Sequence, residues 1–363
     1  MKKKILFIKA SNIDVRTQKF INSLKGNEYQ LYFAGWKREN IIENSNIFSY
    51  FWLLKHAPSQ KPFLVGYYLI WMIKLFFFLL RNHKKFDYIY SINFECAFPT
   101  FLAYKITKKQ YYYDIFDEFA ISYKFPEKIK LLIKKIDKRV KNNATTVIHV
   151  DQNRLSKNEK NYIIIQNTPV DFYNKNYTYK TPKKKIAITG WLVERRGVYS
   201  ITKFIKNNPH IHFIFIGESP KQIQYHLQNI IKQYTNITLH PYLPQNSVFE
   251  LINDVSAIFA LYDPSIEINR KAASNKLYDA MMLGIPLITN RGIKMADYVV
   301  DNNIGIVVDY SYNKSWDSII ELLDDKSNLK EKGLNGRDIY TKEFEFNNIA
   351  KRKFLPLFRN TKC

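Results

Sequence analysis

Short apolar segments with the spacing of buried strands alternate with helical patterns along most of this chain of 363 residues. Such alternation favours parallel sheets covered by helices. It runs in two series, and residues 168–185 between them hold two prolines and no apolar periodicity, as a linker does. A chain of this length can bury two separate cores. The sequence therefore predicts two α/β domains.

The first series opens like a Rossmann-type unit. KILFIK at 4–9 predicts a buried strand, 15–24 a helix, and YQLYFAGW, which ends at Trp36, a second strand. Ligands on such sheets bind beyond the carboxyl ends of the strands, so the loop residues Ser11, Asn12, Asp14 and Arg16 are expected at the edge of a site, or else serve only as caps and solvated loop. Further strands are predicted at 86–92, 110–116, 144–150 and 161–167, with a helix at 97–106.

Residues 63–80 form an apolar run interrupted only by Lys74. Its length reaches the threshold for a membrane span. A strand pattern follows at once, however, and that strand could not pair with residues 4–9 across a bilayer. Three interpretations stay open: a buried core helix, a helix that lies partly in a membrane interface, and a spanning helix.

Residues 127–141 predict a basic amphipathic helix. One stripe carries Ile129, Leu132, Ile133, Ile136 and Val140, and the opposite face carries lysine and arginine. This pattern is typical of binding to an anionic membrane surface, although a solvated lysine face would look the same.

The formal charge of +24 calls for a negatively charged partner or surface. Residues 1–168 hold 29 Lys/Arg and 13 Asp/Glu, a net charge of +16, which leaves +8 for the rest. The first domain is therefore the expected docking surface. Cys96 and Cys363 are too few for a disulfide framework or a zinc site, which fits a reducing compartment, and the apolar run at 5–8 is too short for a signal peptide.

The second series places polar residues at several strand ends. Strands are predicted at 186–192, 212–218, 236–242, 256–262, 285–289 and 305–310. The turn TGWLVERRG after the first of them brings Gly190, Arg195 and Arg196 to the start of a helix near Val198, which suits a phosphate. Gly217 with Glu218, and His240 with Tyr242, end the next two strands on the same edge.

The stretch SNKLYDAMMLGIPLITN at 274–290 predicts a helix capped by Ser274 or Asn275, followed by a tight turn and a buried strand. Lys276 lies in the first turn, and Asp279 lies at i+3 on roughly the same face. A cation beside free helical N–H groups suits a phosphate, and a nearby carboxylate suits a sugar diol. An ordinary capped helix remains the alternative.

Several chemical motifs are absent from the sequence. The seven histidines are scattered, and there is no H-x-x-x-H or D-x-D pair for a metal. A nucleophile elbow, a Walker loop and a G-x-G-x-x-G turn after the first strand of either series are also missing. These absences disfavour kinases, hydrolases and dehydrogenases.

Two Rossmann-like series, the turn formed by Gly190, Leu192, Arg196 and Gly197, and NKLYDAMMLGIPLIT resemble the retaining GT-B glycosyltransferases of glycosyltransferase family 4. This bacterial group builds capsule, O-antigen and exopolysaccharide. The resemblance covers nearly the whole chain. It implies two Rossmann-like doubly wound domains that face a cleft, at 1–168 and 186–340, joined by a linker at 169–185. A C-terminal helix at 341–363 is expected to pack back on the first domain.

The resemblance also implies roles for single residues. Arg196 takes the place of the basic residue on the donor pyrophosphate, and Asp279 that of the second Glu of the E-x7-E motif, which holds the ribose. Asn275 and Lys276 match the N-K-L form of many members. The sequence departs from the pattern at Trp191, where the family has an arginine that Arg195 would replace, and at Lys271, for which Glu267 is the nearest acidic stand-in.

In the first domain, YDIFDE resembles the family's acidic loop that faces the acceptor, which makes Asp117 and Glu118 catalytic candidates beside Arg196 and Lys276. The expected function is sugar transfer, with retention and without a metal or cofactor, from a UDP- or GDP-linked donor to a lipid-linked oligosaccharide or polysaccharide. We expect the protein at the cytoplasmic membrane surface, on anionic lipid and not on nucleic acid. A GT-B sugar-nucleotide epimerase and a basic nucleic-acid-binding protein are the alternatives.

Overall fold

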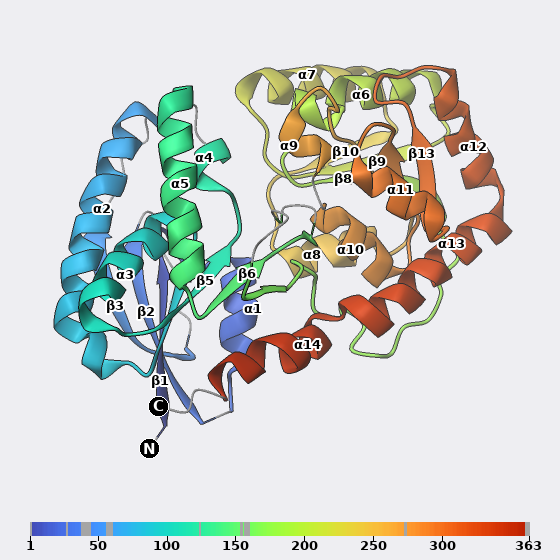
Figure 1. The fold of residues 1–363 in the computed structure, drawn as a ribbon. Coiled ribbons are helices and arrows are strands. Elements are labelled where there is room, and N and C mark those ends of the chain that lie inside the picture. Colours follow the sequence, from blue (N-terminus) through green and yellow to red (C-terminus); the bar gives the residue numbers. More distant parts are fainter. Residues whose placement is uncertain are drawn as a thin grey trace. The chain divides into compact units, whose positions relative to one another are not determined.

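The computed structural model describes residues 2–26, 28–37, 45–55, 61–122, 125–152, 155, 160–271 and 274–359 (Figure 1). The chain divides into two compact units. The first contains residues 1–167 and 349–363, and the second contains residues 168–348. The chain thus leaves the first unit once and returns to it at its end.

The first unit is built on a seven-stranded sheet in the order β3-β2-β1-β4-β5-β6-β7, in which neighbouring strands are parallel. Its strands are β1 (Lys3–Lys9), β2 (Tyr29–Lys37), β3 (Ile47–Lys55), β4 (Tyr88–Ile92), β5 (Tyr111–Ile115), β6 (Thr146–His149) and β7 (Tyr162–Ile164). Strand β1 lies between β2 and β4, and its residues Ile5, Leu6, Phe7 and Ile8 are fully buried because both faces of the sheet are covered.

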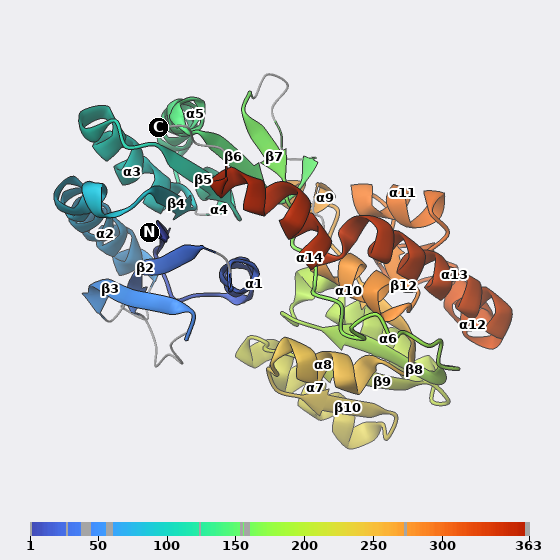
Figure 2. The same cartoon turned by 90° about the horizontal axis from the view of Figure 1, so that it is seen from below.

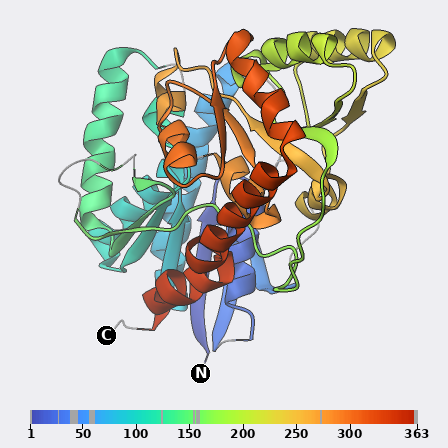
Figure 3. The same cartoon turned by 90° about the vertical axis from the view of Figure 1, so that its right-hand side faces the viewer.

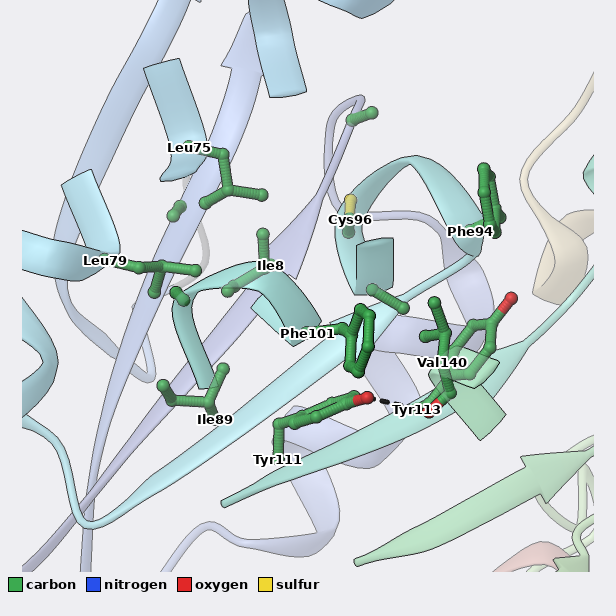
Figure 4. Packing of buried hydrophobic residues seen from close by; sticks show 14 of the residues in the cluster. Ile8, Leu75, Leu79, Ile89, Phe94, Cys96, Phe101, Tyr111, Tyr113 and Val140 are labelled. Carbon is green, nitrogen blue, oxygen red and sulfur yellow. Dashed lines mark hydrogen bonds between the residues drawn. The ribbon is translucent and has the colours of Figure 1, made fainter. Parts of the chain in front are cut away.

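Helices cover both faces of this sheet, as the period-two alternation of strand side chains requires. Leu6 and Ile8 of β1 pack in one cluster with α2 (Lys61–Asn82), α3 (Phe94–Thr107) and α5 (Glu127–Asn143) (Figure 4). Phe7 points the other way, toward Tyr90 at a centroid distance of 5.1 Å, on the face that α1 (Val15–Ser23) covers. The short helix α4 (Phe119–Ser122) precedes α5.

The second unit has a six-stranded sheet in the order β10-β9-β8-β11-β12-β13, again with parallel pairs. Its strands are β8 (Lys183–Thr189), β9 (His212–Ile216), β10 (Ile237–His240), β11 (Val255–Ala260), β12 (Leu287–Asn290) and β13 (Gly305–Val308). Its helices are α6 (Val198–Asn207), α7 (Lys221–Gln233), α8 (Gln245–Ile252), α9 (Glu267–Arg270), α10 (Asn275–Leu283), α11 (Lys294–Asp301), α12 (Asp317–Asp324) and α13 (Lys326–Ile339). Two buried clusters pack against this sheet.

The last segment of the chain packs on the first unit through aromatic side chains. After α14 (Phe346–Ile349), the ring of Phe354 stacks on Phe20 of α1 at 4.3 Å. Phe358 packs against Tyr88 and Tyr112, and its carbonyl accepts a hydrogen bond of 2.7 Å from the Tyr88 hydroxyl. Figures 2 and 3 show this segment in dark red, continuing from α13 to the strands of the first unit.

Strand β3 is an addition to the predicted sheet. Residues 47–55 carry no alternation of apolar and polar side chains, and the strand is defined by its parallel pairing with β2. The apolar run at 63–80 forms α2, whose inner side chains belong to the core. Within the part of the chain that the structure describes, no helix has both the length and the apolar character needed to cross a bilayer.

Candidate functional site

Two turns at the carboxyl edge of the second sheet require glycine, because of their backbone conformation and of close contacts with neighbouring atoms. Gly190 follows β8 with φ +94°, and Gly217 follows β9 with φ +144°. A Cβ on Gly217 would lie 1.8 Å from the carbonyl oxygen of Gly190, and a Cβ on Gly190 would lie 3.2 Å from the Nζ atom of Lys276. The two turns therefore bring backbone and the Lys276 ammonium into one place.

Helix α10 is held in position at its first turn. The Ser274 hydroxyl accepts a hydrogen bond of 3.2 Å from the Lys276 N–H, so Ser274, and not Asn275, is the cap. The Tyr262 hydroxyl donates to the same Ser274 oxygen at 2.7 Å. The Tyr262 backbone exchanges two hydrogen bonds with the side chain of Asn290. The ends of β11 and β12 thereby fix the start of α10 and the position of Lys276.

Arg196 lies on the ring of Tyr262. Its guanidinium carbon is 3.6 Å from the ring centroid, which is a close cation–π contact. Its Nη1 atom is buried and has no hydrogen-bond partner in the described part of the chain. Burial lowers the pKa of Arg196, and Arg195 acts in the same direction. An arginine keeps its charge despite such a shift, so this cation is available to an anion.

Arg196 and Lys276 line one small hollow, which also contains Trp191, Tyr262 and Thr189. Two cations from different elements thus meet beside a Gly turn. The sequence predicted both of them, but it did not predict Tyr262, which supports Arg196. Tyr262 follows β11 on the same sheet edge as Gly190 and Gly217. That position, after a predicted strand, could have indicated its role in the site.

A second, more open hollow adjoins the first. Its lining includes Trp191, Gly217, Glu218, His240 and Tyr242. Trp191 lines both hollows. Its side chain is 48% exposed, and that of Tyr242 is 64% exposed. Exposed aromatic rings beside a polar edge suit a planar ligand.

Five predicted site residues of the second unit line neither hollow as the structure describes them: Gly190, whose turn adjoins Lys276, and Arg195, Glu267, Asn275 and Asp279. Arg195 is exposed, and its carbonyl accepts a hydrogen bond of 3.0 Å from the Asp263 N–H. Asn275 is exposed at the first position of α10, and Asp279 lies 3.5 Å from the Gln245 Nε2 atom. Glu267 of α9 is exposed and lies 4.0 Å from the Lys271 ammonium.

In the first unit, Asp117 and Glu118 follow β5 in a loop that Asn93 holds. The Asn93 side-chain oxygen accepts hydrogen bonds from the backbone N–H groups of Phe116 and Asp117, at 2.9 and 3.3 Å. Asp117 is exposed and Glu118 is half-buried. Both residues therefore sit at the carboxyl edge of the first sheet.

The expectation that Arg16 lies at a site edge is wrong. Its side chain is 3% exposed, and its Nη2 atom forms an ion pair of 3.3 Å with buried Asp114. The Tyr90 hydroxyl donates to the other oxygen of Asp114 at 2.6 Å. Burial raises the pKa of Asp114, although Arg16 and Tyr90 oppose the shift. Arg16 therefore forms a buried ion pair inside the first unit.

Asp14 acts as the cap of α1, accepting a hydrogen bond of 2.9 Å from the Thr17 N–H, and forms an ion pair with Lys9. Burial disfavours its charge, but Lys9 and Thr17 outweigh that cost and hold the pKa of Asp14 below its usual value. No group of three or more His, Cys, Asp or Glu side chains suited to a metal ion is found among the residues described.

Residues 170–338 match the family described as Glycosyl transferases group 1. No curated protein matches the chain in sequence. Among solved structures, sucrose-phosphate synthase from Thermosynechococcus elongatus is 14% identical, with a TM-score of 0.72 and 98% of each chain covered. HepE of Anabaena, solved with UDP and glucose, is 12% identical, with a TM-score of 0.69, and the match covers 99% of this chain and 100% of HepE.

WaaG, described as a glycosyltransferase involved in lipopolysaccharide biosynthesis, is 12% identical, with a TM-score of 0.65, and the match covers 96% of this chain and 98% of WaaG. At these identities the similarity shows the fold alone. The predicted GT-B fold, with two Rossmann-like parallel sheets, is confirmed. The match over residues 170–338 supports a glycosyltransferase.

Proposed function

We propose that this protein transfers a sugar, with retention, from a UDP- or GDP-linked donor to a lipid-linked oligosaccharide or a polysaccharide. The observation that carries the proposal is the cation pair of Arg196 and Lys276 beside Gly190, in one hollow of the second unit. The group 1 match over residues 170–338 supports it, as does the fact that HepE, a structural neighbour, was solved with UDP.

The two cations suit the leaving group of such a reaction. The bond between the anomeric carbon and the phosphate oxygen breaks, and the nucleoside diphosphate takes the bonding electrons. The acceptor hydroxyl forms the new bond on the same face and loses its proton. Arg196 and Lys276 would stabilise the charge that grows on the diphosphate, so the proposed reaction needs no metal.

Other residues receive proposed roles from their positions. Trp191 and Tyr242 would contact the base in the open hollow, with Gly217 and Glu218 beside it. Asn275 and Asp279 of α10 would hold the ribose, and Glu267 would face the donor sugar. In the first unit, Asp117 and Glu118 would serve the acceptor, with one carboxylate taking its proton.

We place the protein in bacterial capsule, O-antigen or exopolysaccharide synthesis, bound peripherally to the inner face of the cell membrane. A lipid-linked acceptor would be met there, and the charge of +24 favours an anionic surface. WaaG, another structural neighbour, is described as acting in lipopolysaccharide biosynthesis, which fits this setting.

A thermal-shift panel of UDP, GDP, ADP and CMP tests the donor class. A nucleotide present at 100 times its dissociation constant should add about 2.7 kcal/mol to the free energy of unfolding. UDP or GDP should stabilise the protein most, and Arg196→Ala should lose much of the shift, while Arg291→Ala, at an exposed ion pair with Asp309, should keep it.

A panel without any stabilising nucleoside diphosphate would contradict the proposal. Nucleotide release from the matching sugar donor then separates the two enzyme classes. A transferase should release nucleotide faster when acceptor lipid is added, whereas an epimerase should convert its nucleotide-sugar without any acceptor.

A further inference from the structure

Helix α2 is apolar on both of its faces. Its inner side chains Tyr68, Trp71, Leu75 and Leu79 are buried in the core of the first unit. On the opposite face, Leu69, Ile73 and Phe77 are 59%, 58% and 51% exposed, and Tyr67 and Ile70 are exposed beside them. The face of a surface helix that points away from the core normally carries charged and polar residues. Here Lys74 is the one charged side chain between positions 67 and 77.

The neighbouring helices add further apolar side chains to the same layer. Helix α2 packs on α3, and α3 packs on α5 (Figures 1 and 2). Ile106 of α3 is 64% exposed, and Leu131 and Leu132 near the start of α5 are 64% and 57% exposed. Single apolar residues on a surface are ordinary, but five exposed apolar side chains within eleven residues of one helix mark an interaction surface.

The charge around this surface selects the kind of partner. The sequence between Glu43 and Asp87 contains no acidic residue. Arg81 is exposed in the last turn of α2, and Lys84 and Lys85 are exposed just after the helix. Helix α5 exposes Lys134, Lys135, Lys138 and Arg139. Its two carboxylates, Glu127 and Asp137, pair with Lys130 and Lys141.

Apolar side chains with surrounding cations fit an anionic lipid bilayer better than either alternative. In a symmetric dimer through this face, each copy would present the same positive charge to the other. Nucleic acid would satisfy the lysines, but it would leave the aliphatic side chains of α2 without a partner.

We infer that the outward face of α2 lies in the headgroup region of an anionic bilayer, with the basic residues of α5 beside it. Residues 67–77 span about 15 Å along the helix, so α2 lies parallel to the membrane plane. The inference rests on the proposed function only in that a lipid-linked acceptor is met at such a surface. Binding has two parts: contacts of the lysines with headgroups, which salt screens, and burial of the α2 face, which salt does not screen.

Vesicle flotation of the full chain tests both parts. The vesicles contain phosphatidylcholine with or without phosphatidylglycerol, at low and at high salt. Ile70→Gln, Ile73→Gln and Phe77→Gln are combined in one variant, because glutamine is polar and favours helix. Its matched control combines Leu251→Gln, Val300→Gln and Leu334→Gln, three exposed apolar positions in helices of the second unit.

The wild type and the matched control should float with phosphatidylglycerol vesicles and keep part of their binding at high salt, whereas the α2 variant should lose the salt-resistant part. A second variant with Lys134→Glu, Lys135→Glu and Lys138→Glu should weaken binding at low salt by about a hundredfold or more, since each cation contributes about fivefold.

Two results would overturn the inference. One is unchanged flotation of the α2 variant at high salt. The other is a wild type that ignores vesicles and forms a dimer that the α2 substitutions dissociate. Thermal shifts with UDP and GDP on the same samples show whether each variant is folded. They also separate the two proposals, because a nucleotide response without vesicle binding refutes the docking surface and leaves the donor site standing.

Discussion

At the scale of single residues, Tyr262 connects the parts of the candidate donor site. Its ring lies 3.6 Å from the Arg196 guanidinium carbon, and its hydroxyl donates to Ser274, which caps the helix that carries Lys276. The charged residues of this site could be predicted from the sequence, because arginine and lysine near glycine turns indicate an anion. Tyr262 could not be predicted, since its role depends on a contact across the sheet edge.

Substitutions at Tyr262 should separate the ring from the hydroxyl. Tyr262→Leu removes the surface under Arg196, a contact that contributes about 1–2 kcal/mol when it is partly desolvated, so kcat/KM should fall roughly tenfold. Tyr262→Phe keeps the ring and loses one hydrogen bond, so it should lower the free energy of unfolding by about 1 kcal/mol with nearly normal kinetics. Steady-state kinetics with urea unfolding checks this, and equal kcat/KM for the two variants would contradict the role of the ring.

At the scale of elements, the segment after residue 168 is more firmly anchored than the pattern of a linker indicates. Asp171 and Arg337 of α13 form a two-pronged ion pair with oxygen–nitrogen distances of 2.7 and 2.8 Å, and both side chains are almost buried. Arg337 also donates to the Met282 carbonyl at 2.7 Å, and the rings of Tyr173 and Tyr177 lie near its guanidinium. A lack of apolar periodicity does not reveal such a pair, because its partners are 166 residues apart.

Asp171→Asn should destabilise the second unit strongly, since it leaves a buried arginine without its counter-charge. Loss of one partner of a buried pair costs about 3–5 kcal/mol. Asp338→Asn, at an exposed pair with Lys342, is the control and should change the free energy of unfolding by less than about 0.5 kcal/mol. Urea unfolding at neutral pH gives both values, and equal values for the two variants would refute the anchor.

The ion pair of Asp171 and Arg337 also predicts how the free energy of unfolding changes with pH. Burial disfavours the Asp171 carboxylate, but hydrogen bonds from Arg337 and the Lys175 and Tyr173 N–H groups outweigh it, so the pKa of Asp171 is lowered. Its stabilising effect is fully present above the unfolded value of about 3.9 and is lost as the pH falls through the lower folded value. The difference in the free energy of unfolding between the wild type and Asp171→Asn should therefore become smaller only at acidic pH.

At the scale of the whole molecule, the number and class of the domains followed from the sequence, because buried parallel strands and amphipathic helices have distinct periods. Strand β3 could not be predicted in this way, since an edge strand is defined by its pairing with the neighbouring strand. Helix α2 also shows a limit of such patterns, because an apolar run of its length suits a core, an interface and a span. The structure shows that one face is buried and the other exposed, a distinction that depends on packing against α3.

In the proposed donor site, Arg196 and Lys276 of the second unit would bind the diphosphate of a nucleotide-sugar. The most direct measurement is nucleotide release from UDP- and GDP-sugars by Arg196→Ala, with Arg291→Ala as the matched control. The charge of Arg196 matters most when the leaving group gains charge, so kcat/KM should fall by about a hundredfold or more while nucleotide affinity falls less. Release by Arg196→Ala at the wild-type rate would contradict the placement of the donor in the second unit.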